Sequence, residues 1–274
     1  MKTAVVTLTD QGYFHKAKRT ILDIRSRGEW TGDLVLITVG FDAPPNFLDY
    51  YRIIGKRVEH LNTSQVIEAY KTHPIRPTCD NREFAKLTQW DKFHVFNPFF
   101  AYWDRVIFID AGLRVLDRIQ YLADLPCENV LLAPDDAPLY DTEKRFGGII
   151  ETDRNPEVAN ALFEEYGRHI LDLRYFLNCI WMYDTALLKT ISIEELVNTM
   201  NKYPICRCNE MTIMNLVFTY KYKVWQPFPE YITDNKNVRR RLFGWTEWDR
   251  DYGHTTWRDF CFLKYPTTIN FDSE

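Results

Sequence analysis

The chain has 274 residues, of which 46% are hydrophobic and 26% charged, and its formal net charge is −4 at pH 7. This length suits one large domain or two small ones, and the composition is that of a globular protein. A negative net charge argues against a general nucleic-acid binder, which needs cationic contacts with phosphate. No run approaches the roughly 20 apolar residues that cross a bilayer, so no transmembrane segment is expected.

The six cysteines are scattered through the sequence. This distribution favours reduced thiols and a cytoplasmic location over a disulfide framework. Cys206 and Cys208 lie one residue apart, but no second Cys/His pair has the spacing of a zinc site.

The chain opens with a strand–helix–strand pattern. Residues 3–9 and 33–39 are strand-like, and residues 13–27 have helical periodicity. Such an opening favours parallel pairing through a right-handed crossover.

Polar residues follow the first strand, among them Thr9, Asp10 and Tyr13. They form no G-x-G-x-x-G pattern, so a dinucleotide dehydrogenase of the usual kind is not expected. These residues could instead meet a nucleotide, with Tyr13 as a stacking face, or they could form a plain polar loop.

Further segments alternate between strand and helix. Strands are expected within 51–60, 105–109, 129–133 and 175–184, and helices within 83–96, 155–171, 193–202 and 208–218. From residue 223 the periodicity is weak, which predicts an irregular C-terminal segment. We expect a single domain over 1–274, with a nucleotide-sugar-binding half (1–134), an acceptor half (135–222) and a C-terminal wrap (223–274).

The most informative stretch is the apolar run Val106–Ile109, which halts at Asp110 and is followed by Gly112. Four apolar residues in a row predict a buried strand of a parallel sheet. Ligands of open α/β sheets collect at the carboxyl ends of the strands. Asp110 could therefore hold a divalent cation or a sugar hydroxyl, or it could simply cap a turn.

Several short motifs follow one another along the chain in a characteristic order. They are Lys92 ahead of a strand that ends Asp110-Ala111-Gly112, then Ala133-Pro134-Asp135, Phe176-Leu177-Asn178-Cys179, and Glu210 to Asn215. This order resembles the GT-A glycosyltransferases, and most closely the family 8 group that includes glycogenin and bacterial galactosyltransferases. Gly112 departs from that family's pattern because it stands where the second acid of an Asp-x-Asp pair is usual.

The resemblance implies an α/β fold of the GT-A type, a Rossmann-like, mostly parallel sheet flanked by helices. It also implies transfer of a sugar from a nucleotide-diphosphate sugar, UDP-linked by expectation, to a glycan, lipid or protein. With the polar residues after the first strand, the residues expected to bind the donor are Thr9, Asp10, Tyr13, Lys92, Asp110, Ala111, Gly112 and Lys264.

A diphosphate leaving group gains negative charge as its bond to the sugar breaks, so cations are needed beside it. The expected cofactor is Mn(II) or Mg(II), with Asp110 and His254 as ligands. Lys264 and the run Arg239–Arg241 are further candidate partners of the diphosphate, although three consecutive arginines are more often solvated.

Glu210, Asn178 and Asp135 are the candidate catalytic residues. An amide such as Asn178 can orient sugar hydroxyls, and Glu210 could act as a general base or stabilise a cationic sugar centre. Asp135 and its neighbour Asp136 could meet the acceptor or serve as the base. For Glu210 the alternative is an acid that favours the start of a helix.

Two other functions remain open from the sequence. One is a sugar-1-phosphate nucleotidyltransferase, although the segment from Thr9 to Tyr13 is a poor version of its Gly-rich loop. The other is a catalytically inactive carbohydrate-binding protein that kept the fold after losing the second acid at Gly112.

Overall fold

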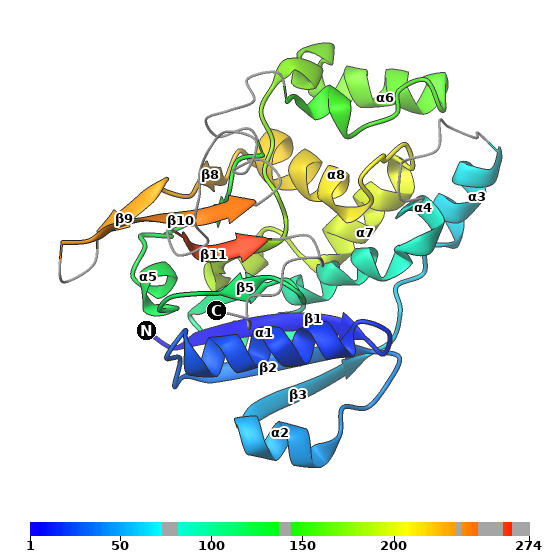
Figure 1. Cartoon of the computed structure of the whole chain (residues 1–274). Helices are drawn as coiled ribbons and strands as arrows, with labels where there is room; N and C mark the ends of the chain where they lie inside the picture. The colour runs from blue at the N-terminus through cyan, green and yellow to red at the C-terminus, as the bar shows by residue number, and fades with distance from the viewer. Residues whose placement is uncertain (73–81, 137–143, 234–236, 246–259, 265–274) are drawn as a thin grey trace.

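The computed structural model describes residues 1–72, 82–136, 144–233, 237–245 and 260–264 (Figure 1). Its centre is a seven-stranded sheet in the order β3-β2-β1-β4-β7-β6-β8. The strands are β1 (Thr3–Asp10), β2 (Asp33–Val39), β3 (Ile53–Val58), β4 (Arg105–Ile109), β6 (Leu131–Ala133), β7 (Ile180–Asp184) and β8 (Trp225–Pro227).

Most neighbours in this sheet are parallel; only β7 runs antiparallel to β4 and β6. The inner residues of β1, β2 and β4 are almost fully buried. Helices cover both faces, so the apolar runs of these strands have no solvent-facing side. The predicted α/β class with a largely parallel sheet is confirmed.

Helices and short helical turns fill the connections. They are α1 (Phe14–Ser26), α2 (Pro45–Tyr51), α3 (Ser64–Thr72), α4 (Arg82–Ala85), η1 (Leu87–Phe96), η2 (Pro98–Tyr102), α5 (Gln120–Ala123), η3 (Phe146–Gly148), α6 (Pro156–Tyr166), η4 (Arg168–Asp172), η5 (Thr185–Lys189), α7 (Ile193–Lys202), α8 (Glu210–Met214) and η6 (Asn215–Lys221).

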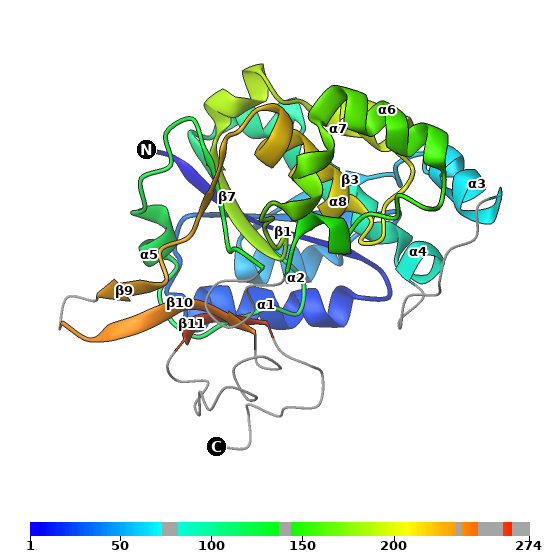
Figure 2. The ribbon, with the colours of Figure 1, turned by 90° about the horizontal axis from the view of Figure 1, so that it is seen from above.

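Two helices show how sequence spacing places them. On α1, Ala17, Ile21 and Ile24 recur every three or four residues and are fully buried. On α7, the Ser192 hydroxyl accepts from the Glu195 N–H and caps the first turn. Figure 2 shows α1 on one side of the central sheet and α6, α7 and α8 on the other.

A second, four-stranded sheet has the order β5-β11-β10-β9. Its strands are β5 (Arg114–Val115), β9 (Tyr231–Thr233), β10 (Arg239–Trp245) and β11 (Phe260–Lys264). It lies beside α1 in Figure 2. The expectation of an irregular segment after residue 223 was therefore wrong for β9, β10 and β11. These strands pair in sequence, and β11 also pairs with β5, which lies more than a hundred residues earlier in the chain.

Three predicted elements differ in detail. The helix expected over 83–96 is a short α4 followed by the 3₁₀ turns of η1. The strand expected over 175–184 begins only at Ile180. The helix expected over 208–218 changes from α8 to a π-helical segment at Asn215. Among the described residues, no helix is both long enough and apolar enough to cross a membrane.

Candidate active site

A cleft of about 270 Å³ opens at the carboxyl ends of β1 and β4, two neighbouring parallel strands. Ligands of open α/β sheets bind at this edge. The lining residues are Leu8, Thr9, Asp10, Tyr13, Lys16, Ala85, Lys86, Thr88, Gln89, Lys92, Asp110, Ala111 and Lys264. The cleft thus brings together every residue that was predicted to bind the donor except Gly112.

Four lysines and two carboxylates line this cleft, which gives it a formal charge of +2. Lys16, Lys86, Thr88 and Gln89 were not predicted as site residues. Lys16 lies three residues after Tyr13 in the first turn of α1, and Lys86 and Gln89 are also three apart. The spacing of three residues within each pair was the only sequence signal that the two side chains of a pair lie on the same side of their helix.

The loop between β1 and α1 is held in place by Asp10. Its Oδ1 accepts from the Tyr13 N–H at 2.8 Å, and its Oδ2 accepts from the Thr88 hydroxyl at 2.7 Å. The Tyr13 side chain stays 43% exposed at the cleft, with the Lys16 ammonium 4.8 Å from its ring centroid. Asp10 therefore orders the loop, while Tyr13 presents an aromatic face on which a nucleobase could stack.

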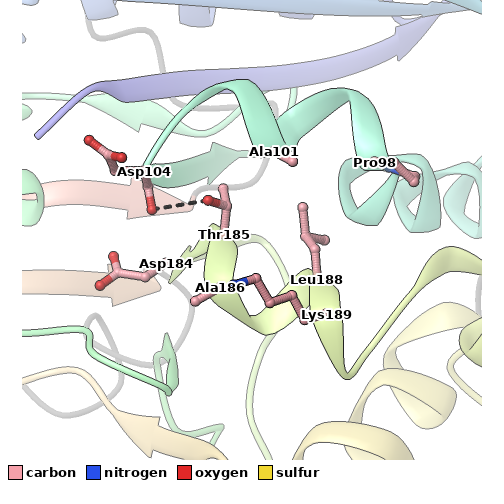
Figure 3. A pocket seen from close by; sticks show the side chains of 8 residues that line it. All are labelled: Pro98, Ala101, Asp104, Asp184, Thr185, Ala186, Leu188 and Lys189. Carbon is pink, nitrogen blue, oxygen red and sulfur yellow. Dashed lines mark hydrogen bonds between the residues drawn. The ribbon is translucent and has the colours of Figure 1, made fainter.

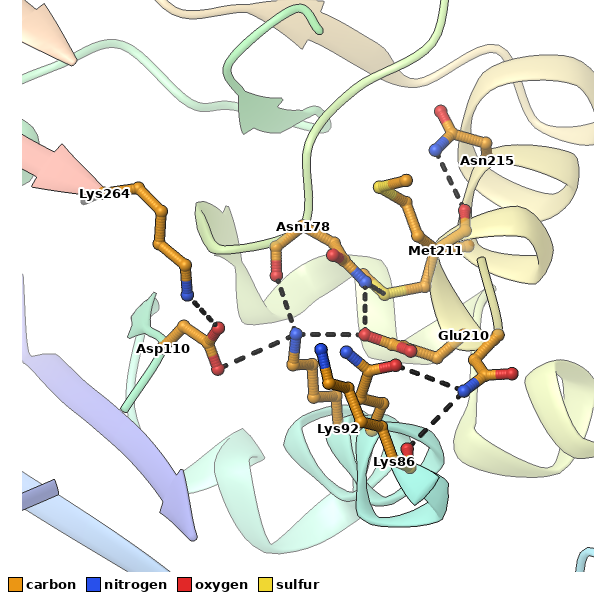
Figure 4. A network of polar contacts seen from close by, with 11 residues as sticks. Lys86, Lys92, Asp110, Asn178, Glu210, Met211, Asn215 and Lys264 are labelled. Atoms are coloured by element: carbon orange, nitrogen blue, oxygen red, sulfur yellow. Dashed lines mark hydrogen bonds and ion pairs between the residues drawn. The ribbon is translucent and has the colours of Figure 1, made fainter. Parts of the chain in front are cut away.

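Asp110 lies between two lysines from separate elements. Lys264, at the end of β11, donates to Asp110 Oδ2 at 2.9 Å, and Lys92 Nζ, on η1, is 3.7 Å from Oδ1. Figure 4 shows that the two ammonium groups reach the carboxylate from different sides. The Asp110 N–H donates to the Cys179 carbonyl at 2.8 Å, which fixes the strand end beside β7.

These contacts set the ionisation of the three groups. Burial alone would raise the pKa of Asp110, but attraction from Lys264 and Lys92 outweighs it and lowers that pKa. Burial would lower the pKa of each lysine, but Asp110 raises both, and Glu210 adds to the effect on Lys92. All three groups are therefore charged near neutral pH.

Behind Lys92 lie Glu210 and Asn178 (Figure 4). Glu210 Oε1 is 3.0 Å from Lys92 Nζ and accepts from the Asn178 side-chain amide at 2.8 Å, and the Asn178 carbonyl accepts from Lys92 at 3.3 Å. Glu210 and Asn178 are both buried. Glu210 Oε2 is buried without a hydrogen-bond partner in the described part of the chain.

Glu210 follows Asn209, which has a positive φ of 45° and starts α8. The Glu210 side chain is therefore more than an acid at a helix start, because it pairs with Lys92 and Asn178. Asn178 lies in the segment before β7 and not at the carboxyl end of a strand as expected. Since β7 is antiparallel, its first residues meet the end of β4, which brings Asn178 to the same edge as Asp110.

Asp135 and Asp136 follow β6 but have different surroundings. Arg174 holds both oxygens of Asp135, with its Nη2 2.9 Å from Oδ2 and its Nε donating to Oδ1 at 3.2 Å. This bidentate pair occupies both carboxylate oxygens of Asp135. Asp136 is buried, accepts from the Tyr175 hydroxyl and has Lys144 Nζ at 3.6 Å. Burial raises the pKa of Asp136 to about 6 against the opposing effects of Lys144 and Tyr175.

The side chains around Asp110 and the conformation of Gly112 bear on the predicted metal site. Gly112, in the place of a second acid, has a φ of +94°, which favours glycine, and it does not line the cleft. The Asp110 carboxylate is paired with two ammonium groups, which would repel a divalent cation. His254 lies outside the described residues, and within them no three His, Cys, Asp or Glu side chains converge. The described residues therefore do not fit a divalent metal at Asp110.

The run Arg239–Arg241 does not line the cleft. Arg240 pairs with Asp117 at 2.9 Å, and the Arg239 guanidinium lies 3.7 Å from the Tyr231 ring centroid. The suggestion that this run contacts the diphosphate stays a prediction, and the contacts described for these arginines are with residues outside the cleft.

A larger cavity, of about 520 Å³, lies elsewhere on the surface (Figure 3). It is lined by Pro98, Ala101, Asp104, Asp184, Thr185, Ala186, Leu188 and Lys189. Asp104 immediately precedes β4, so this cavity is at the opposite edge of the sheet. Its Asp184 already accepts from Arg105 at 2.7 Å. Position and charge therefore favour the smaller, lysine-lined cleft as the active site.

No family model matches the sequence, and no curated protein matches it either. The structure, in contrast, matches solved glycosyltransferases. The galactosyltransferase LgtC, in complex with donor and acceptor sugar analogues, aligns over 97% of this chain and 87% of its own, with a TM-score of 0.60 and 12% identity.

The chain has the GT-A glycosyltransferase fold. The glycosyltransferase GlyE of Streptococcus pneumoniae aligns with 98% of this chain and 55% of its own, at 14% identity and a TM-score of 0.54. Core-mannan synthase A of Aspergillus fumigatus, in an Mn/GDP form, covers 83% of this chain and 73% of its own, at 8% identity and a TM-score of 0.51. The GT-A fold expected from the sequence is confirmed, and at these identities the match concerns the fold alone.

Proposed function

We propose that this protein is a glycosyltransferase that moves a sugar from a nucleoside-diphosphate sugar, a UDP-sugar by preference, to a hydroxyl of a glycan, lipid or protein. The observation that carries the proposal is the lysine-lined cleft at the carboxyl ends of β1 and β4 in a GT-A fold. Its charge suits a diphosphate, and Tyr13 at its edge suits a base. With it we propose a cytoplasmic location, supported by the free thiols of the five described cysteines.

The reaction breaks the bond between the anomeric carbon and the oxygen of the β-phosphate. The nucleoside diphosphate leaves with the electron pair, a new bond forms to the acceptor oxygen, and the acceptor hydroxyl gives up its proton. Negative charge grows on the leaving group, so Lys92 and Lys264 would stabilise the transition state more than the ground state.

Glu210 and Asn178 would serve the sugar side of the site. Glu210 Oε1 is held by Lys92 and Asn178, which fixes the carboxylate, while Oε2 has no hydrogen-bond partner among the described residues. Glu210 is buried and does not line the cleft, so this role requires that the sugar reach it behind Lys92. A fixed carboxylate with one oxygen free of hydrogen bonds to the described residues can accept a proton or stabilise positive charge on the sugar ring. Asp136 is the second candidate for the base, because its pKa of about 6 suits proton transfer near neutral pH. Asp135 is third, because Arg174 occupies both of its oxygens.

Core-mannan synthase A was solved in an Mn/GDP form. The Mn(II) or Mg(II) expected from the sequence is the alternative to the two lysines at Asp110, and no step above depends on it.

The test is incubation with a panel of nucleotide sugars and separation of the products by anion-exchange chromatography. Transfer to water or acceptor predicts slow release of nucleoside diphosphate. Release of sugar 1-phosphate in the presence of pyrophosphate would indicate a nucleotidyltransferase instead. Binding of the panel without any turnover would indicate a carbohydrate-binding protein.

A further inference from the structure

Within the described part of the chain, the neighbours of the carboxylate at the end of β4 do not suit a metal ligand. An acid that binds a divalent cation needs other oxygen or nitrogen ligands beside it. Asp110 instead has the Nζ atoms of Lys264 at 2.9 Å and of Lys92 at 3.7 Å, and both ammonium groups border the cleft.

The backbone at Gly112, where a second acid would stand, also disfavours a side chain. Gly112 has a φ of +94°, and a Cβ placed there would lie 3.3 Å from Lys16 Cδ. The Gly112 N–H donates to the Thr20 hydroxyl at 3.0 Å, which holds this turn against α1. An acidic side chain at this position would strain the backbone and press on Lys16.

We propose that Lys92 and Lys264 take the place of a divalent cation at the donor diphosphate, and that Asp110 positions the two lysines instead of binding a metal. Two ammonium groups carry the same formal charge as one such cation. This inference rests on the proposed function, because it assigns the donor's diphosphate to the same cleft.

Lys92 and Lys264 differ in exposure and contacts, so we expect them to have different roles. Lys92 has 7% of its side chain exposed and is fixed by Glu210 and the Asn178 carbonyl as well as by Asp110. Lys264 has 27% exposed, and Asp110 is the partner that orients it. Lys264 is therefore placed to contact the phosphates directly, while Lys92 contributes a fixed charge from beneath.

The experiment is isothermal titration calorimetry of the full chain with UDP, GDP, CDP, ADP and dTDP, once in EDTA and once in MnCl₂. The expected result is a dissociation constant for the preferred nucleotide that agrees within about twofold between the two buffers. Lys264→Met should raise that constant by about tenfold or more in both, which is the effect of losing one charge-assisted hydrogen bond. Lys221→Met is the matched control, because it removes an ion-paired lysine, 2.6 Å from Glu195, that is not part of the cleft.

Binding that is tenfold or more tighter in MnCl₂, or a Lys264→Met variant with unchanged affinity, overturns the inference and leaves the proposed function standing. Failure of all five nucleotides in both buffers overturns the proposed function and the inference together. Melting temperatures of both variants check that the protein remains folded. The experiment replaces Lys264 and not Lys92, because loss of Lys92 would leave the buried Glu210 carboxylate without its cation. After loss of Lys264, Asp110 still has Lys92 beside it.

Discussion

Lys264 donates to Asp110 across 154 residues of sequence, at 2.9 Å. This contact joins the last described strand, β11, to the end of the central strand β4. It therefore makes the second sheet part of the cleft, because Lys264 lies on β11, which pairs with β5 and β10. The C-terminal strands are thus expected to matter for ligand binding as well as for stability.

The buried pair of Lys92 and Glu210 should contribute strongly to stability. Removing one partner leaves the other charge buried, so Lys92→Met and Glu210→Gln should each lower the free energy of unfolding by about 2–4 kcal/mol. The double variant should cost less than the sum of the two. The measurement is urea denaturation of all four proteins.

The exposed pair of Lys221 and Glu195 is the control for that cycle, with side chains 38% and 25% exposed. Its coupling should stay under about 1 kcal/mol. Equal coupling free energies in the two pairs would contradict the strong interaction between Lys92 and Glu210 that their geometry indicates.

Turnover should distinguish Glu210 from Asp135. If Glu210 works on the reacting sugar, Glu210→Gln should lower kcat by about 10²-fold or more, the usual scale for a lost acid–base group. Asp135→Asn should change kcat by less than about threefold, because Arg174 already occupies that carboxylate. The comparison uses initial rates of nucleoside diphosphate release, with circular dichroism to confirm folding. A large loss in Asp135→Asn alone would reverse the two assignments.

The Asp136 carboxyl should make stability depend on pH. Its pKa is raised by burial from 3.8 to about 6, so the folded protein keeps a proton that the unfolded chain releases near pH 4. The stability supplied by this group is therefore present below about pH 4 and is lost as the pH rises through about 6. Asp136→Asn should remove this dependence.

The measurement is the difference in free energy of unfolding between Asp136→Asn and the unchanged protein, at pH 4 and at pH 7.5. That difference should shift in favour of the variant by on the order of 2–3 kcal/mol between the two pH values. A difference that is the same at both pH values would mean that folding does not raise the pKa of Asp136.

The sequence predicted those parts of the site that depend on local patterns. A run of apolar residues ending in Asp110 was enough to place a strand and its terminal acid. Because carboxyl ends of parallel strands share one edge, the loop after β1 could also be expected beside it. These two features account for most of the donor-side residues in the cleft.

Other parts could not be read from local patterns because distant contacts decide them. Arg174 lies 39 residues from Asp135, so no sequence signal marked the pair that occupies this candidate base. The sequence could not show that each arginine of the run Arg239–Arg241 has a partner outside the cleft; these partners are Tyr231, Asp117 and Glu230 in turn. Of the strands after residue 223, β11 pairs with the short β5, which no periodicity marks, and β8 pairs with the distant β6.

The backbone conformation of Gly112 is a testable reason for the absence of a second acid at this position. Gly112→Ala should destabilise the protein by about 1 kcal/mol or more, because alanine disfavours a φ of +94° and its Cβ would contact Lys16. Gly148→Ala is the matched control, since a Cβ there would have no neighbour within 4 Å and its φ is not in the positive range. Thermal denaturation of both variants is the measurement, and equal melting temperatures would show that the turn tolerates a side chain.

The most direct test of the donor cleft is a crystal structure with the tightest-binding nucleoside diphosphate, grown in EDTA. The diphosphate should lie at the carboxyl ends of β1 and β4, with phosphate oxygens within about 3 Å of Lys264 Nζ, and with the base against Tyr13. A nucleotide bound instead in the cavity beside Asp104 and Asp184, at the opposite edge of the sheet, would contradict the assignment of the active site.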